Sequence, residues 1–203
     1  MSNGRILNED AWGFMNALFA TKDATTIHSV QNLWTTALGP QAIFPLDPTP
    51  ASPRTSFTFS VKEALTTNNE HDATIVELLV AAPASQAVTK AALDEESIKT
   101  RQVLVVSCKS ALKDTPAGWT CAEEQLGQYL EEKMNHCERV YAAVAIGTKV
   151  VFFRRDRSQG GAGQMTQIHS GALDFQVPAH RRLIEGHFEE INNHGKAWAE
   201  SLW

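Results

Sequence analysis

The middle of the chain alternates apolar runs with one helix-like segment. An apolar run at residues 103–106 ends in Ser-Cys-Lys109, and residues 122–134 then carry apolar side chains at every third or fourth position. Two further apolar runs, 140–146 and 149–153, are joined by a Gly-Thr pair that suits a two-residue hairpin turn. The pattern predicts a strand, a helix and a β-hairpin, with one lysine where the first of these strands ends.

The segment before this centre predicts two more strands. Alternation over 56–62 predicts a strand with one wet face, and the apolar stretch 73–81 predicts a strand buried on both faces. Five prolines between residues 39 and 54 exclude a helix or a central strand there. Residues 82–100 are rich in Ala, Ser and charge, and they predict either a surface helix or a mobile insertion.

Helices are predicted at both ends of the chain. Asn8 and Thr26 can cap two N-terminal helices, and residues 179–203 repeat apolar positions every three or four residues. The apolar stripe predicted for the first helix consists of Trp12, Met15, Leu18 and Phe19. The last segment predicts a long amphipathic helix that covers the sheet.

Length and composition favour one globular domain. A chain of 203 residues that is 43% hydrophobic can build one full core but not two comfortable ones. We expect the helices and Pro-rich loop of residues 1–54 to pack on a core formed by residues 55–203. The expected class is α/β.

Charge and cysteine usage exclude several classes of protein. A net charge of -5 and a pI near 5.8 provide no global basic field for nucleic acid, so any such contact must be a local patch. The three cysteines lack CxxC spacing, which argues against a disulfide framework and a zinc ribbon. With no apolar run near the roughly 20 residues of a membrane span and no secretion signal, we expect an intracellular, nuclear or cytoplasmic protein that does not contact a membrane.

Acids and one amine are expected to converge at one edge of the sheet. If strands 73–81 and 103–107 pair antiparallel, Asp72 lies beside Lys109. The following helix brings Glu123, Glu124 and Gln125 over the same strand end. A carboxylate pair there is suited to Mg²⁺ or Mn²⁺, with Lys109 orienting a water molecule or phosphoryl oxygens.

This arrangement resembles the PD-(D/E)XK, or restriction-endonuclease-like, nuclease superfamily. The matching features are the element order αβββαβ, an acid before the second strand and a lysine that closes the third. His71-Asp72 stands for the Pro-Asp element, and Ser107-Cys108-Lys109 stands for (D/E)-X-K with serine in place of the acid. The resemblance implies a mixed five-stranded sheet flanked by helices.

Three groups within that superfamily are similar in further detail. Restriction enzymes that cut around CCGG have the same serine and carry the acid on the next helix, where this chain has Glu123. Gln125 and Tyr129 match the QxxxY element of exonuclease-like branches. On a helix Glu123 and Gln125 are about 200° apart and flank opposite sides of the apolar stripe, so we do not expect both to serve one metal. Residues 142–154 resemble a hairpin of mainly fungal nuclease-like relatives.

The resemblance implies a Mg²⁺-dependent phosphodiesterase acting on DNA or, less favoured, RNA. Asp72 and Glu123 would ligate the metal with the Cys108 carbonyl, and Lys109 would position the water, with Gln125 as a further catalytic candidate. Phosphate contacts would come from Lys113, Arg154, Arg155 and Arg157. The alternative is a nuclease-like domain that has lost catalysis and serves as a binding or assembly module for protein or nucleic acid, with a protein partner or as a homodimer. The serine at 107 and the acidic pI favour this alternative.

Simpler interpretations of the same residues remain open. Lys109 at a strand end can be a solvent-facing lysine, Asp72 a turn residue, and Gln125 and Tyr129 the rim of the core. Cys108 is a buried hydrophobe or, in a third reading, a nucleophile. The three histidines of the last helix, His180, His187 and His194, are predicted to form a solvated stripe, because they are too far apart to ligate one metal.

Overall fold

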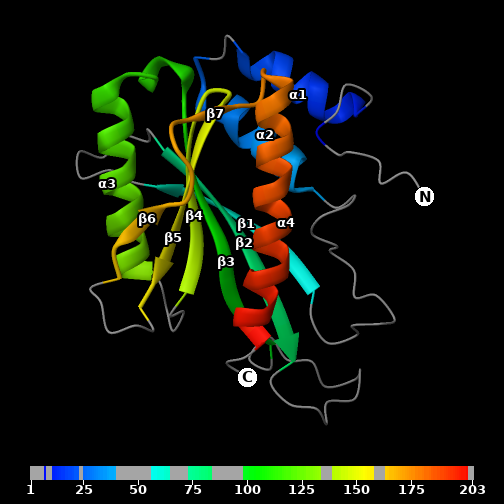
Figure 1. The fold of residues 1–203 in the computed structure, drawn as a ribbon, viewed down its shortest axis with the longest axis vertical. Coiled ribbons are helices and arrows are strands. Elements are labelled where there is room, and N and C mark those ends of the chain that lie inside the picture. Colours follow the sequence, from blue (N-terminus) through cyan, green and yellow to red (C-terminus); the bar gives the residue numbers. More distant parts are fainter. Residues whose placement is uncertain are drawn as a thin grey trace.

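The protein folds as a mixed α/β structure in which one sheet separates two unequal layers of helices (Figure 1). The computed structural model describes residues 7, 11–22, 25–39, 56–64, 73–83, 98–133, 139–157 and 163–200. Helix α3 (Pro116–Lys133) covers one face of the sheet. Helices α1 (Trp12–Lys22), α2 (Ile27–Leu38) and α4 (Pro178–Glu200) pack on the other.

The sheet is larger than predicted. Among the described residues it has seven strands, in the order β1-β2-β3-β4-β5-β6, with β7 also paired to β5. The strands are β1 (Ser56–Ala64), β2 (Ala73–Pro83), β3 (Ile98–Lys109), β4 (Arg139–Ile146), β5 (Lys149–Asp156), β6 (Met165–Gln167) and β7 (Leu173–Asp174). The five-strand prediction missed β6 and β7 because two or three residues are too few for an alternation to be read.

The strand pairing follows from the connections. Helix α3 carries the chain from the end of β3 back across the sheet, so β3 and β4 pair parallel. The other pairings among the described strands are antiparallel, including the predicted one between β2 and β3. The sheet is therefore mixed, as predicted.

The β4–β5 hairpin turns at Gly147, as the Gly-Thr pair predicts. Its φ of 59° lies in the left-handed region that favours glycine. A Cβ at this position would lie 3.0 Å from the Cβ of Ala111. The backbone N–H of Gly147 donates a hydrogen bond to the carbonyl of Lys109 at 3.1 Å. The hairpin turn is thereby fixed against the end of β3.

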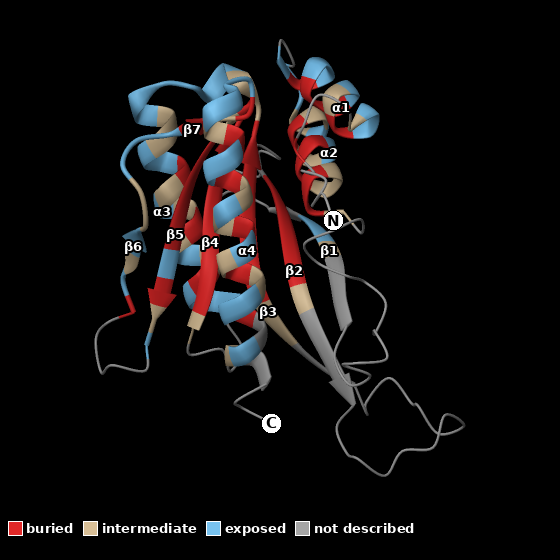
Figure 2. Cartoon of the chain, turned by 45° about the vertical axis from the view of Figure 1, so that its right-hand side comes forward, coloured by how far each residue is buried: buried red, intermediate tan, exposed pale blue. Residues whose placement is uncertain are grey.

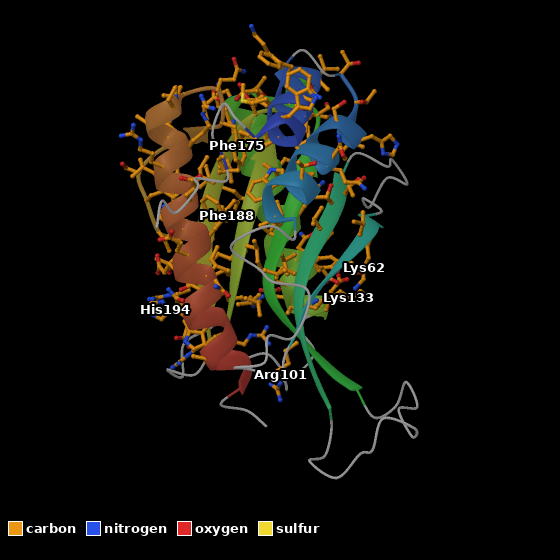
Figure 3. The ribbon with its side chains drawn as sticks, turned by 90° about the vertical axis from the view of Figure 1, so that its right-hand side faces the viewer. Lys62, Arg101, Lys133, Phe175, Phe188 and His194 are labelled. Atoms are coloured by element: carbon orange, nitrogen blue, oxygen red, sulfur yellow. The ribbon has the colours of Figure 1, made fainter. Side chains whose placement is uncertain are left out.

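Strands β2, β3, β4 and β5 supply side chains to two separate cores, one on each face of the sheet. On the α3 face, alternate residues of β3, β4 and β5 pack with Ala122, Leu126 and Leu130. On the opposite face, Trp34 from α2 meets Phe152, Phe175 and Phe188 in edge-on contacts. Figure 2 shows buried strands between helices whose outer sides are exposed, and Figure 3 shows Phe175 and Phe188 in the layer beside α4.

Predictions for the ends of the chain had mixed outcomes. The predicted C-terminal helix is confirmed as α4. The predicted stripe of α1 is wrong in part, because Trp12 and Phe19 are 77% and 67% exposed, whereas Phe14, Ala17 and Leu18 are buried. The prediction of a helix over 82–100 is wrong at both ends of that range, because β2 continues to Pro83 and β3 begins at Ile98. Residues 84–97 lie outside the described part of the chain.

No helix in the described ranges combines the length and apolar character needed to cross a membrane.

Candidate functional site

Two strands direct polar side chains into the seam between the sheet and α3. Val105 of β3 faces the α3 core, and alternation puts Ser107 and Lys109 on that same face. Ile75 of β2 also faces α3, so Glu77, two residues later, does too. Each of these side chains is buried.

Lys109 is held by the helix. Its side chain is 2% exposed, and its Nζ donates a hydrogen bond to Oε1 of Gln125 on α3. A buried ammonium is costly unless acceptors surround it. Gln125 therefore stabilises a charge at the point where β3 ends.

Glu77 is the second charged group in the seam. Its Oε1 accepts hydrogen bonds from the Tyr129 hydroxyl at 2.7 Å and from Nε2 of Gln102 at 2.6 Å. The ammonium of Lys62, on a half-exposed side chain, lies 2.6 Å from Oε2, in an ion pair that lacks the alignment of a hydrogen bond. Burial and the neighbouring carboxylate raise the pKa of Tyr129, so the phenol stays protonated and donates.

These contacts form a row rather than one constellation. Glu77 pairs with Val105, which is four residues before Lys109 on β3, a separation of about 13 Å along the strand. Gln125 and Tyr129 bridge the row from successive turns of α3. We call Lys62, Glu77, Gln102, Lys109, Gln125 and Tyr129 the polar seam.

Half of the polar seam is predicted by the sequence. Lys109, Gln125 and Tyr129 are among the predicted site residues, whereas Lys62, Glu77 and Gln102 are not. The signal that could have found them is Glu77, the single acid within an otherwise apolar strand. A strand that is covered on both faces buries such an acid, and a buried charge needs partners.

Glu123 lies on the other flank of α3. It lines an open groove of about 500 Å³ with Glu124, Glu131 and Arg155, on the side of β5 and β6. Partial burial raises the pKa of its carboxyl. The prediction that Glu123 and Gln125 flank opposite sides of the apolar stripe is confirmed, because Gln125 contacts Lys109 whereas Glu123 lines the groove on the other side.

The structure does not gather the predicted phosphate-binding arginines around Lys109. The hairpin carries β5 back down the sheet, which places Arg155 six residues, or about 20 Å, from the strand end that holds Lys109. Arg155 is buried on the α3 face, whereas Arg154 pairs with Tyr141 on the opposite face. Arg157 follows β5, and Lys113 lies in a short 3₁₀ helix after β3, Ala111–Lys113.

Cys108 faces the core opposite to Lys109. It is fully buried, and burial raises the pKa of its thiol far above the ordinary value. A thiolate nucleophile is therefore disfavoured, and the position suits the small buried hydrophobe.

The predicted acid Asp72 lies outside the described residues. The antiparallel register that was expected to bring it to Lys109 is present, since Thr74 pairs with Cys108. Within the described ranges, His, Cys, Asp and Glu side chains form no group of three or more that could hold a metal ion.

The histidines of α4 are not one solvated stripe. His194 is exposed, but the His187 ring contacts Phe152 and His169, and His180 accepts a hydrogen bond from the Asp174 amide at 3.0 Å. Burial lowers the pKa of both His169 and His187. This part of the prediction is wrong because α4 is rotated to bury that side under β7 and the segment after β6.

Comparisons with known proteins give no assignment: no family model, curated protein or solved structure matches this chain.

Proposed function

We propose that this chain is a nuclease-like domain that has no phosphodiesterase chemistry and serves as a protein-binding module. The observation that carries the proposal is the polar seam, in which acid, amine, amide and phenol are hydrogen-bonded or ion-paired to one another. Catalysis by a metal and a general base needs groups that are open to substrate and arranged around one point. The contacts of the polar seam join β1, β2 and β3 to α3, and they instead stabilise the packing of α3 on the sheet.

Two further observations support a protein partner over nucleic acid. The arginines expected to bind phosphates are divided between two faces and lie far from Lys109, and the net charge is -5. Trp12 and Phe19 are exposed two helical turns apart on α1, and exposed aromatic side chains are enriched where proteins bind one another.

The second candidate is the Mg²⁺-dependent nuclease. Lys109 favours it, because a buried lysine ends β3 directly beside the strand that Asp72 precedes, and Gln125 of the QxxxY element contacts that lysine. In this candidate Asp72 and Glu123 would bind Mg²⁺ with the Cys108 carbonyl. Two acids count against this candidate. Glu123 lies on the flank of α3 away from Lys109, and Glu77 already accepts hydrogen bonds from Gln102 and Tyr129.

A metal titration separates the two. We expect calorimetry to show no uptake of Mg²⁺ or Mn²⁺ by the folded wild type, and labelled single- and double-stranded DNA and RNA to remain intact with either ion. Thermal unfolding should be the same with EDTA and with Mg²⁺, and the same for Asp72→Ala as for the wild type.

If the wild type binds metal and cuts nucleic acid, and Asp72→Ala does neither, the protein-binding proposal is overturned in favour of the Mg²⁺-dependent nuclease. Lys22→Ala, on the far helix α1, is the control for nonspecific charge effects.

A further inference from the structure

The groove on the Glu123 flank of α3 contains a buried arginine with unsatisfied donors. Arg155 is 2% exposed, and its Nε and Nη1 are buried with no acceptor in the described part of the chain. Its Nη2 lies 3.5 Å from Oε1 of Glu131, whose side chain is 65% exposed. A guanidinium has five N–H donors, and burying them without acceptors is costly. An added acceptor would therefore be bound favourably.

Carboxylates of α3 also line the groove. Glu123 and Glu124 lie two turns before Glu131 on α3, and eight residues of helix span about 12 Å. A lone anion at Arg155 would meet these negative charges, and a lone cation would meet the arginine. The groove is complementary to a ligand with an anionic group at one end and a cationic group at the other.

The middle of the groove is open and borders a sheet edge. Gly127 contributes no side chain there, and a Cβ built on it would lie 3.7 Å from Cε of Met165 on β6. Strand β6 is last in the sheet order and runs alongside α3 (Figure 1). An edge strand beside a groove is a common place for an extended peptide to bind.

We propose that this groove binds an extended peptide segment that carries a basic side chain and, four residues later, a carboxylate. In an extended chain, residues i and i+4 project to the same side about 13 Å apart, which matches the charges of the groove. The carboxylate displaces Glu131 from Arg155, and the basic group lies between Glu123 and Glu124. This inference rests on the proposed function, and it names the chemistry of the partner.

The probe is the fluorescently labelled, end-capped peptide Lys-Ser-Ala-Ser-Glu, measured by anisotropy at low ionic strength. We expect saturable binding to the wild type, and at least tenfold weaker binding when either the Lys or the Glu of the peptide is replaced by Gln. Inorganic phosphate alone should bind more weakly than the peptide.

Variants of the groove give matched tests. Gly127→Leu should abolish binding by filling the groove, whereas Gly127→Ala should keep it. Arg155→Gln should weaken binding at least tenfold. Glu131→Gln should strengthen it a few fold, because the ligand carboxylate then has no competitor; loss of a merely structural ion pair would not increase affinity. If the Arg155→Gln variant does not fold, the binding measurements on Gly127→Leu and Glu131→Gln still test the proposal.

Three results would overturn the inference: no binding to the folded wild type, equal binding of the Gln-substituted peptides, or unchanged binding to Gly127→Leu. None of them involves metal uptake or cutting, so they leave the proposed module standing. Conversely, metal uptake with cutting would overturn the module, whatever the peptide does.

Discussion

The two flanks of α3 carry the same kinds of charged side chain, and they differ in how those side chains are paired. On the flank toward β2 and β3, Lys109 and Glu77 are buried and bonded to Gln125 and Tyr129. On the flank toward β5 and β6, Arg155 is just as buried but has only a weak contact with an exposed Glu131. The first arrangement stabilises the fold, and the second leaves donors available to a ligand.

The largest expected effect comes from removing the acid of the polar seam. Glu77→Ala leaves the Tyr129 hydroxyl and the Gln102 amide buried without their acceptor, and it should lower the free energy of unfolding by about 3 kcal/mol. Urea denaturation measures this loss. The exposed Glu124→Ala on the other flank is the control and should change stability by less than about 0.5 kcal/mol. Equal effects at both positions would remove the distinction between the flanks.

Tyr129→Phe tests a single contact of the seam. It removes one hydrogen bond to a buried carboxylate and keeps the ring, so we expect a loss of about 1.5 kcal/mol. A double-mutant cycle with Glu77→Gln should show coupling, because the two residues share that bond. Additive effects would mean that the hydroxyl does not bind Glu77 in solution.

Gly127→Ala tests whether the groove flank is free of packing constraints. The added Cβ would make only an ordinary contact with Met165, and alanine stabilises a helix interior by about 1 kcal/mol over glycine. We therefore expect a gain in the free energy of unfolding, measured in urea. Gly186 in α4, where an added Cβ meets nothing, is the matched control. A loss at Gly127 with a gain at Gly186 would indicate a closed groove.

The smallest expected effect is a difference in titration between two carboxylates of the α3 region. Burial raises the pKa of Glu123. Burial would also raise the pKa of Asp114, but hydrogen bonds from Lys149 and Trp119 outweigh it and lower that pKa. Carboxyl ¹³C NMR titration should find Glu123 above and Asp114 below their ordinary values.

These two directions have opposite consequences for stability. A raised folded pKa favours the protonated carboxyl, so the contribution of Glu123 is present below its unfolded pKa and is lost as pH rises through the folded one. The contribution of Asp114 is present above its unfolded pKa and is lost as pH falls through the folded one. Glu123→Gln and Asp114→Asn should change the pH profile of unfolding in opposite directions; the same direction for both would contradict burial as the dominant influence on Glu123.

The sequence by itself determined the main helices and strands and the face on which several side chains lie. Apolar runs locate β2, β3 and the β4–β5 hairpin, and helical periodicity locates α3 and α4. Within an element, the face on which a side chain lies follows from its spacing alone. The same spacing correctly separated Gln125 from Glu123 on α3. It also placed Lys109 at the end of β3.

Only the tertiary structure decided which charged groups meet. Lys109 and Arg155 belong to one stretch of sequence, yet the hairpin places them about 20 Å apart. Glu77 and Tyr129 are 52 residues apart and share a hydrogen bond. Spacing fixes the face of a side chain within its own element, but the contacts between elements depend on register and strand order, which are set by the packing of the whole chain.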